Sequence, residues 1–173
     1  MKRTIVPEFE IARIFPKKRL TLALAESCTG GLASHLVTLV PGSSAYFLGS
    51  VVSYSNEVKT DVLGVLPALI KKHGAVSRQV AASMAEGARK ALSSDMAASV
   101  TGIAGPAGAR PGKPVGTAFM AVAMEGKTRT KKVNFSGTRE ELKAKFADSL
   151  LKFVLETATR HDLQHRVLQH PVL

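Results

Sequence analysis

The stretch that decides the fold is Ala25-Glu26-Ser27-Cys28-Thr29-Gly30-Gly31. It follows the apolar run at 20–24 and precedes a helical pattern formed by Leu32, Leu36 and Val40. A strand that turns straight into a helix leaves backbone N–H groups free at the helix N-terminus, and these donors favour anions. Ser27 thus stands where a phosphate or an oxyanion can bind, although a serine at this place also serves as an ordinary helix cap.

The composition indicates one folded domain. The chain has 173 residues, of which 45% are hydrophobic and 21% charged, as in ordinary globular proteins. We expect one domain over 1–173, with its core at about 8–158 and a weakly ordered basic tail at 159–173. Apolar runs are too short for a membrane helix, and the first residues lack the apolar core of a signal peptide, which predicts a cytoplasmic protein without membrane contact.

The net charge of +11 points to an anionic partner. Nucleic acid is one candidate, but the basic residues are scattered along the chain, and two tyrosines, seven phenylalanines and no tryptophan offer little base-stacking surface. The cluster Lys17-Lys18-Arg19 is typical of a solvated helix end. We therefore expect a small anionic substrate rather than nucleic acid.

Strands and helices alternate along the chain. Apolar and β-branched runs predict strands at 20–24, 45–54, 97–100, 115–124 and 128–135. Helical periodicity and capping residues predict helices at 9–15, 32–40, 56–63, 66–72, 77–92 and 138–158, the last opened by a capping box of Thr138 and Glu141. The pattern predicts an α/β fold, a layered α/β/α domain with a mostly parallel sheet plus one β-hairpin.

Three loops leave predicted strands at the same end of the sheet, at Ser27, Tyr54 and Thr101. In open α/β sheets the ligand crevice lies at the carboxyl ends of the strands, so we expect these loops to meet in space. The glycine-rich loop 101–108 fits a backbone that approaches a ligand closely. A flexible surface turn is the alternative, and it is favoured for the part at 110–113.

The first candidate centre is Ser27 with Tyr54 and Lys59. A serine hydroxyl is a poor nucleophile until a base takes its proton, and a desolvated lysine or tyrosine can do so. Tyr54 ends a strand and Lys59 lies about one turn into the next helix, so both can face the crevice. The alternative is a core aromatic at Tyr54 and a solvated lysine at 59.

Further candidates flank this centre. Backbone N–H groups of Thr29, Gly30 and Gly31 would stabilise an oxyanion. Cys28 is intrinsically a stronger nucleophile than serine, but without a histidine partner a packed, inert thiol is the alternative. Arg139, just before the last helix, can grip a phosphate with two parallel hydrogen bonds, or it is an ordinary first-turn residue.

No motif indicates a metal or a cofactor. A single cysteine excludes a multi-cysteine metal site. His161 and His165 stand one helical turn apart, but Asp162 replaces the glutamate of zinc proteases. The glycine-rich loop has neither the spacing of a dinucleotide fingerprint nor that of a P-loop.

Six motifs in a fixed order carry a family resemblance. They are the stretch at 25–31, Pro41-Gly42-Ser43-Ser44, Tyr54-Ser55-Asn56-Glu57-x-Lys59, His73-Gly74-Ala75-Val76-Ser77, Thr101-Gly102-Ile103-Ala104-Gly105-Pro106 and Lys113-Pro114-Val115-Gly116-Thr117. Across about 20–155 they resemble the CinA C-terminal domain family. The resemblance implies hydrolysis of the amide of nicotinamide mononucleotide, which gives nicotinic acid mononucleotide and ammonia in pyridine nucleotide salvage. It also implies no metal, no cofactor, and a homodimer or larger homo-oligomer.

The resemblance assigns roles position by position. It implies that Ser27 is the nucleophile or its activator, with Tyr54 and Lys59 completing a serine amidase-like centre. The substrate-binding residues that we expect are Thr29, Gly30, Gly31, Ser44, Asn56, Thr101, Gly102, Ile103, Ala104, Gly105 and Arg139. The alternatives are a non-catalytic nucleotide-binding module and a DNA-associated protein linked to competence or damage.

Overall fold

A five-stranded sheet forms the centre of the part of the chain that the structure describes. The computed structural model describes residues 6–169, with side chains described through Arg160. In sheet order the strands are β2 (Phe47–Val52), β1 (Leu22–Glu26), β3 (Met96–Gly102), β4 (Thr117–Met124) and β5 (Lys127–Asn134). β1 pairs in parallel with β2 and β3, and β4 pairs antiparallel with β3 and β5. Only β4 runs against the other strands of this sheet, and the predicted hairpin is β4–β5.

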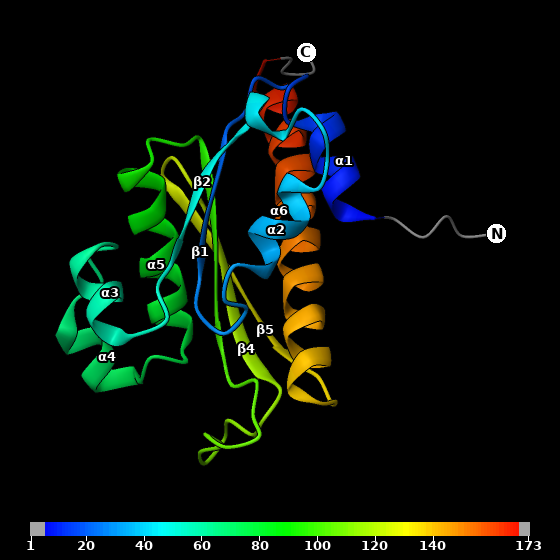
Figure 1. Ribbon diagram of the computed structural model, residues 1–173. Helices are drawn as coiled ribbons and strands as arrows, with labels where there is room; N and C mark the ends of the chain where they lie inside the picture. Colours follow the sequence, from blue (N-terminus) through cyan, green and yellow to red (C-terminus); the bar gives the residue numbers. More distant parts are fainter. Residues whose placement is uncertain (1–5, 170–173) are drawn as a thin grey trace.

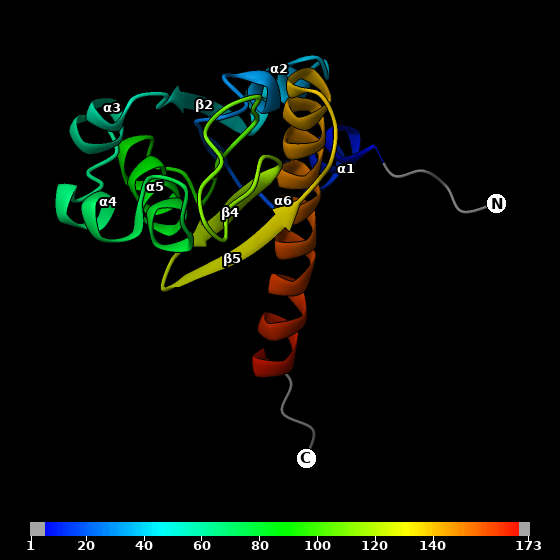
Figure 2. The ribbon, with the colours of Figure 1, turned by 90° about the horizontal axis from the view of Figure 1, so that it is seen from below.

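Helices cover both faces of this sheet. They are α1 (Pro7–Ile14), α2 (Leu32–Thr38), α3 (Asn56–Asp61), α4 (Pro67–His73), α5 (Arg78–Ala91) and α6 (Arg139–Gln169), with a short 3₁₀ helix η1 (Ser43–Ala45). Figures 1 and 2 show α3, α4 and α5 on one side of the sheet and α1, α2 and α6 on the other. The layered α/β/α class predicted from the sequence is confirmed.

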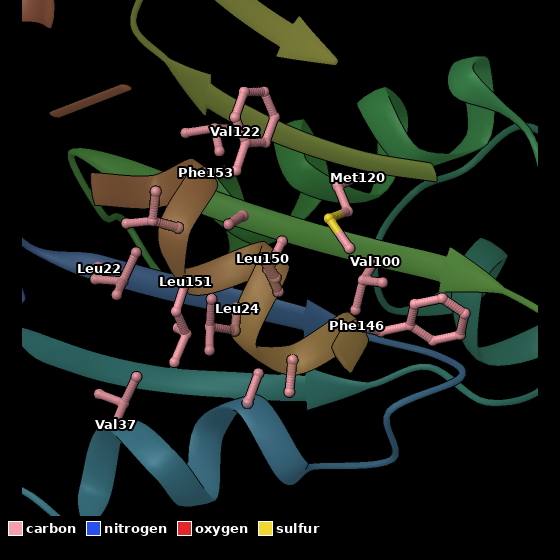
Figure 3. Packing of buried hydrophobic residues seen from close by; sticks show 14 of the residues in the cluster. Leu22, Leu24, Val37, Val100, Met120, Val122, Phe146, Leu150, Leu151 and Phe153 are labelled. Carbon is pink, nitrogen blue, oxygen red and sulfur yellow. The ribbon is translucent and has the colours of Figure 1, made fainter. Parts of the chain in front are cut away.

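The larger core lies between the sheet and α6. Side chains alternate between the two faces of a strand, so every second residue of β1 and β3 points to α6. Figure 3 shows Leu24 and Val100 on this face with Phe146 and Leu150 of α6, and all four side chains are fully buried. Burying a side chain of this size stabilises the fold by about 1.5–3 kcal/mol.

The opposite face of the sheet packs on α5 through small side chains. Ala23 and Ala25 of β1 lie in one buried cluster with Met84 of α5. A methyl group at Gly87 would lie 1.9 Å from the carbonyl oxygen of Leu63. Helix α5 therefore lies so close to the segment after α3 that only glycine fits at this position. The alanine-rich stripe of α5 therefore sets a short distance between helix and sheet.

The capping box of α6 forms as the sequence predicts. The Thr138 N–H donates to Glu141 Oε2 at 2.8 Å, and the Glu141 N–H donates to Thr138 Oγ1 at 3.3 Å. Helix α3 begins at Asn56, as the sequence predicts. Ser55, not Asn56, is the cap residue, because its Oγ accepts a hydrogen bond from the N–H of Val58.

Helix α6 is longer than predicted. We expected it to end near Ala158, but its backbone continues to Gln169. The rest of the predicted tail, and the side chains of His161 and His165, lie outside the described residues. None of the helices within residues 6–169 is both long and apolar enough to span a membrane.

Candidate active site

The carboxyl ends of β2, β1 and β3 lie level in the sheet. Glu26 at the end of β1 pairs with Val52 of β2 on one side and with Val100 of β3 on the other. The segments that follow these strands enclose a cavity of about 530 Å³, to which Ser27 and Thr101 contribute. The three loops therefore meet, as their position at the sheet edge predicts.

Lys59 is directed at Ser27 inside this cavity. Its Nζ lies 3.1 Å from Ser27 Oγ, and only 1% of the lysine is exposed. The same nitrogen donates to three backbone carbonyls at the start of α3, those of Ser53 at 2.6 Å and of Tyr54 and Ser55 at 3.3 Å. Lys59 is thus a buried residue held by its own loop, and the alternative of a solvated helix lysine is wrong.

Burial makes the charged form of Lys59 less stable. Loss of water around the ammonium lowers the pKa of Lys59 below its usual value, although the nearby Cys28 and Glu57 oppose the shift. A neutral amine has two N–H groups, enough for two of the three carbonyls at a time, and one lone pair that can accept the Ser27 hydroxyl proton. The geometry therefore allows Lys59 to act as a base toward Ser27.

Cys28 lines the same cavity but has the wrong protonation state for a nucleophile. Its side chain is buried within the core cluster on the α6 side. Burial raises the pKa of Cys28 to about 12. The thiol therefore stays protonated at neutral pH, and the thiolate is the form that attacks.

The N-terminus of α2 already holds an anion from the protein itself. The carboxylate of Glu26 is fully buried and accepts hydrogen bonds from the N–H groups of Gly31 at 3.0 Å, Ala33 at 3.1 Å and Ser34 at 2.8 Å. The Ser34 hydroxyl also donates to Glu26. A glutamate placed shortly before the glycine pair is the sequence signal for this cap, which was not among the predicted features.

The N–H groups of Gly30 and Gly31, which we expected to stabilise an oxyanion, already have acceptors within the protein. The Gly30 N–H donates to the Ser27 carbonyl at 3.2 Å, and the Gly31 N–H is used by Glu26. Thr29 is fully buried, and none of these three residues lines the cavity. The glycines serve the turn instead, because both have positive φ angles, +63° and +96°.

Ser44 and Asn56 have different positions relative to the cavity. Asn56 is the first residue of α3 and lines it. Ser44 is an exposed residue of η1, before the start of β2, whereas the cavity follows the end of β2. A strand of this length separates the two ends by roughly 20 Å. Within this chain, Ser44 therefore lies away from the cavity that Asn56 lines.

The loop at 101–105 lines the cavity as expected. The Thr101 hydroxyl donates to the Ala75 carbonyl at 2.9 Å, which ties the end of β3 to the segment between α4 and α5. A Cβ at Gly102 would lie 2.7 Å from that of Ala118, so glycine is required for strand packing there. Ile103 and Ala104 are buried and line the cavity.

Arg139 bridges two loops at the cavity. Its Nη1 donates to the Gly105 carbonyl at 2.6 Å, and its Nη2 donates to the Tyr54 hydroxyl at 2.9 Å. The Tyr54 hydroxyl thus accepts a hydrogen bond from Arg139, whereas the Tyr54 carbonyl accepts one from Lys59. Tyr54 is 61% exposed, so it is not a core aromatic.

Further cations that the sequence motifs did not place at the site also line the cavity. They are Lys71, Arg110 and Lys113. No aspartate or glutamate is among the described residues that line it. Nor do three His, Cys, Asp or Glu side chains gather anywhere in the described part of the chain, as a protein-built metal site requires. The cavity is therefore suited to an anion.

Fold and site together define an α/β domain with a buried lysine–serine pair in a cationic cavity. The family model for the CinA C-terminal domain matches residues 7–158. The chain belongs to this family, which confirms the resemblance seen in the sequence.

Similar proteins support the same assignment. A CinA-like protein of a Geobacter species is 54% identical over 133 residues, which cover 77% of this chain and 32% of the relative. The chain thus spans about a third of the length of the curated relatives that it matches.

Solved structures share the fold. The competence damage-inducible protein A of Klebsiella pneumoniae matches with a TM-score of 0.84 at 33% identity. The match covers 87% of this chain and 93% of the Klebsiella chain. A CinA superfamily protein of Enterobacter cloacae has a TM-score of 0.87 at 29% identity, covering 91% and 95%.

Proposed function

We propose that the protein hydrolyses the amide of nicotinamide mononucleotide to nicotinic acid mononucleotide and ammonia. The observation that carries the proposal is the 3.1 Å contact between Lys59 Nζ and Ser27 Oγ inside a cavity. Membership of the CinA C-terminal domain family supports it. The cationic lining suits an anionic nucleotide, and the volume of about 530 Å³ is in the usual range for small-molecule sites.

In the first half of the reaction Ser27 is the nucleophile and Lys59 the base. Neutral Lys59 takes the hydroxyl proton while Ser27 Oγ forms a bond to the amide carbon. The C–N bond of the resulting tetrahedral oxyanion then breaks, and the Lys59 ammonium returns the proton to the leaving amino group, which departs as ammonia.

In the second half water hydrolyses the acyl-enzyme. Lys59, again neutral, takes a proton from water as the oxygen attacks the ester carbon. The bond between Ser27 Oγ and carbon breaks, and the proton held by Lys59 returns to Ser27. The product leaves as the carboxylic acid, which loses its remaining proton to solvent and becomes the carboxylate. Water is the only co-reactant.

Because Glu26 occupies the α2 terminus, the oxyanion needs other donors. Ala104 and Gly105 line the cavity, and no described residue accepts a hydrogen bond from either backbone N–H. We assign the stabilisation of the oxyanion to these two amides. Tyr54 and Arg139, joined to each other, are assigned to holding the substrate beside Ser27.

Product analysis tests this function. The wild-type protein and Ser27→Ala are incubated with nicotinamide mononucleotide, and ammonia and nicotinic acid mononucleotide are measured together. We expect equal amounts of both products from the wild type and none above background from the variant. Binding of the nucleotide by the wild type without either product would instead favour a non-catalytic nucleotide-binding module.

A further inference from the structure

A second group of cations lies in the cavity, apart from Arg139. Lys71 comes from α4, whereas Arg110 and Lys113 come from the long loop between β3 and β4. Figure 1 shows α4 beside the lower part of the sheet and this loop extending below it, toward the same end of the molecule. We call these three residues the Lys71 cluster.

The backbone directs two members of the Lys71 cluster to one side of the loop. The Arg110 N–H donates to the Lys113 carbonyl at 3.0 Å, and the Lys113 N–H donates to the Arg110 carbonyl at 2.9 Å. Two residues that exchange both hydrogen bonds in an antiparallel bridge carry their side chains on the same side of the ribbon. The turn that the sequence marked as flexible thus presents two cations together.

A side-chain contact joins this turn to α4. Lys113 Nζ donates to the carbonyl of His73, the last residue of α4, at 3.0 Å. Lys71 lies two residues earlier on the same helix. The following segment is fastened to β3 by the bond from Thr101 to Ala75. The Lys71 cluster is therefore held against the strand next to the one that carries Ser27.

Two cations of the cluster have no acidic partner. Within the described part of the chain no carboxylate pairs with Lys71 or Arg110, and none lines the cavity. Arg139, by contrast, already donates to Gly105 and to Tyr54. Like charges gathered in a cleft attract an anion, and a phosphate accepts several charge-assisted hydrogen bonds at once.

We propose that the phosphate group of the nucleotide substrate binds at Lys71, Arg110 and Lys113, and not at Arg139. The inference rests on the proposed function for the identity of the substrate. It assigns the two parts of the ligand to two different groups of residues that line the cavity. The phosphate lies at the Lys71 cluster, and the amide lies between Ser27 and the loop that Arg139 holds.

Calorimetric binding of ribose 5-phosphate, with ribose as the uncharged reference, tests this site. The test variant is the double substitution Lys71→Met with Arg110→Met, and the control is Lys72→Met, which removes an exposed charge from the same helix outside the cavity. We expect the double variant to raise the Kd for ribose 5-phosphate by about tenfold or more, with the control within about twofold of the wild type. Thermal unfolding checks that the variants remain folded.

The outcomes separate this inference from the proposed function. Equal Kd values for the double variant and Lys72→Met would overturn the inference, as would a wild type that binds ribose 5-phosphate no better than ribose. Loss of binding in Arg139→Lys, but not in the double variant, would move the phosphate to Arg139. If the wild type releases no ammonia from nicotinamide mononucleotide, the proposed function fails, yet the ribose 5-phosphate result still decides where phosphate binds.

Discussion

The Nζ of Lys59 lies 3.1 Å from the Oγ of Ser27, although the two residues are 32 positions apart in the chain. The contact exists because β1 and β2 are parallel neighbours whose carboxyl ends lie level, and because only the short segment 53–55 separates β2 from α3. Burial then lowers the pKa of the lysine, which favours the neutral amine that can take the Ser27 hydroxyl proton. The pair and its surroundings determine how the protein should respond to pH and to substitution.

The rate of amide hydrolysis should rise with pH. The neutral form of Lys59 is the active one. Because burial lowers the pKa of Lys59 from the ordinary 10.5, the rising part of the pH–rate profile lies at lower pH than for an exposed lysine. We expect kcat/KM for nicotinamide mononucleotide to increase with pH and to level off below pH 10.5. A rate that falls over this limb would show that the protonated lysine is the active form.

Cys28→Ala should retain its activity within about threefold, because a thiol with a pKa near 12 does not supply the nucleophile. The same burial should make alkylation of native Cys28 by iodoacetamide much slower than alkylation of the unfolded chain. Mass spectrometry after timed exposure measures this difference. Loss of turnover in Cys28→Ala with intact substrate binding would move the nucleophile to the cysteine.

Glu26→Ala should destabilise the fold. The substitution leaves the buried N–H group of Ala33 and the partly buried N–H groups of Gly31 and Ser34 without their acceptor. It should lower the free energy of unfolding, measured in urea, by about 3 kcal/mol or more. Glu125→Ala, at the exposed turn of the β4–β5 hairpin, is the matched control and should change stability by less than about 0.5 kcal/mol. Equal effects of the two substitutions would contradict the role of Glu26 as the α2 cap.

Tyr54→Phe should lower activity much less than replacement of Lys59. The phenylalanine variant loses only the hydroxyl that pairs with Arg139, whereas the backbone carbonyl that holds Lys59 remains. We expect the loss, about tenfold or less, to appear mainly in KM. A fall in kcat as large as that of Lys59→Met would place the Tyr54 hydroxyl in the proton transfer itself.

Positions at strand ends were predictable because they depend on local rules. Parallel strands present their carboxyl ends at one edge, so Ser27, Tyr54 and Thr101 were expected to meet. Lys59 was expected to face the same crevice because it lies about one turn into the helix that follows Tyr54. The capping box of Thr138 is visible in four consecutive residues and needs no knowledge of the rest of the fold.

Features that depend on contacts between residues that are not close neighbours in the sequence were missed or misplaced. Glu26 reaches forward to amides up to eight residues later, which turned an expected substrate site into a structural cap. The sequence favoured a flexible surface turn at 110–113. It does not reveal the hydrogen bond from Lys113 to His73, because the two residues are 40 positions apart in the chain. Ser44 was expected at the site, yet it lies before β2, at the end of that strand that is farther from the cavity.

The most direct measurement is the rate of ammonia release from nicotinamide mononucleotide by the wild type and by Lys59→Met. Methionine keeps much of the length and burial of the lysine but cannot accept a proton. We predict that kcat falls by about 100-fold or more while circular dichroism shows an unchanged fold. Ammonia release at the wild-type rate from a folded Lys59→Met protein would contradict the role of Lys59 as the base.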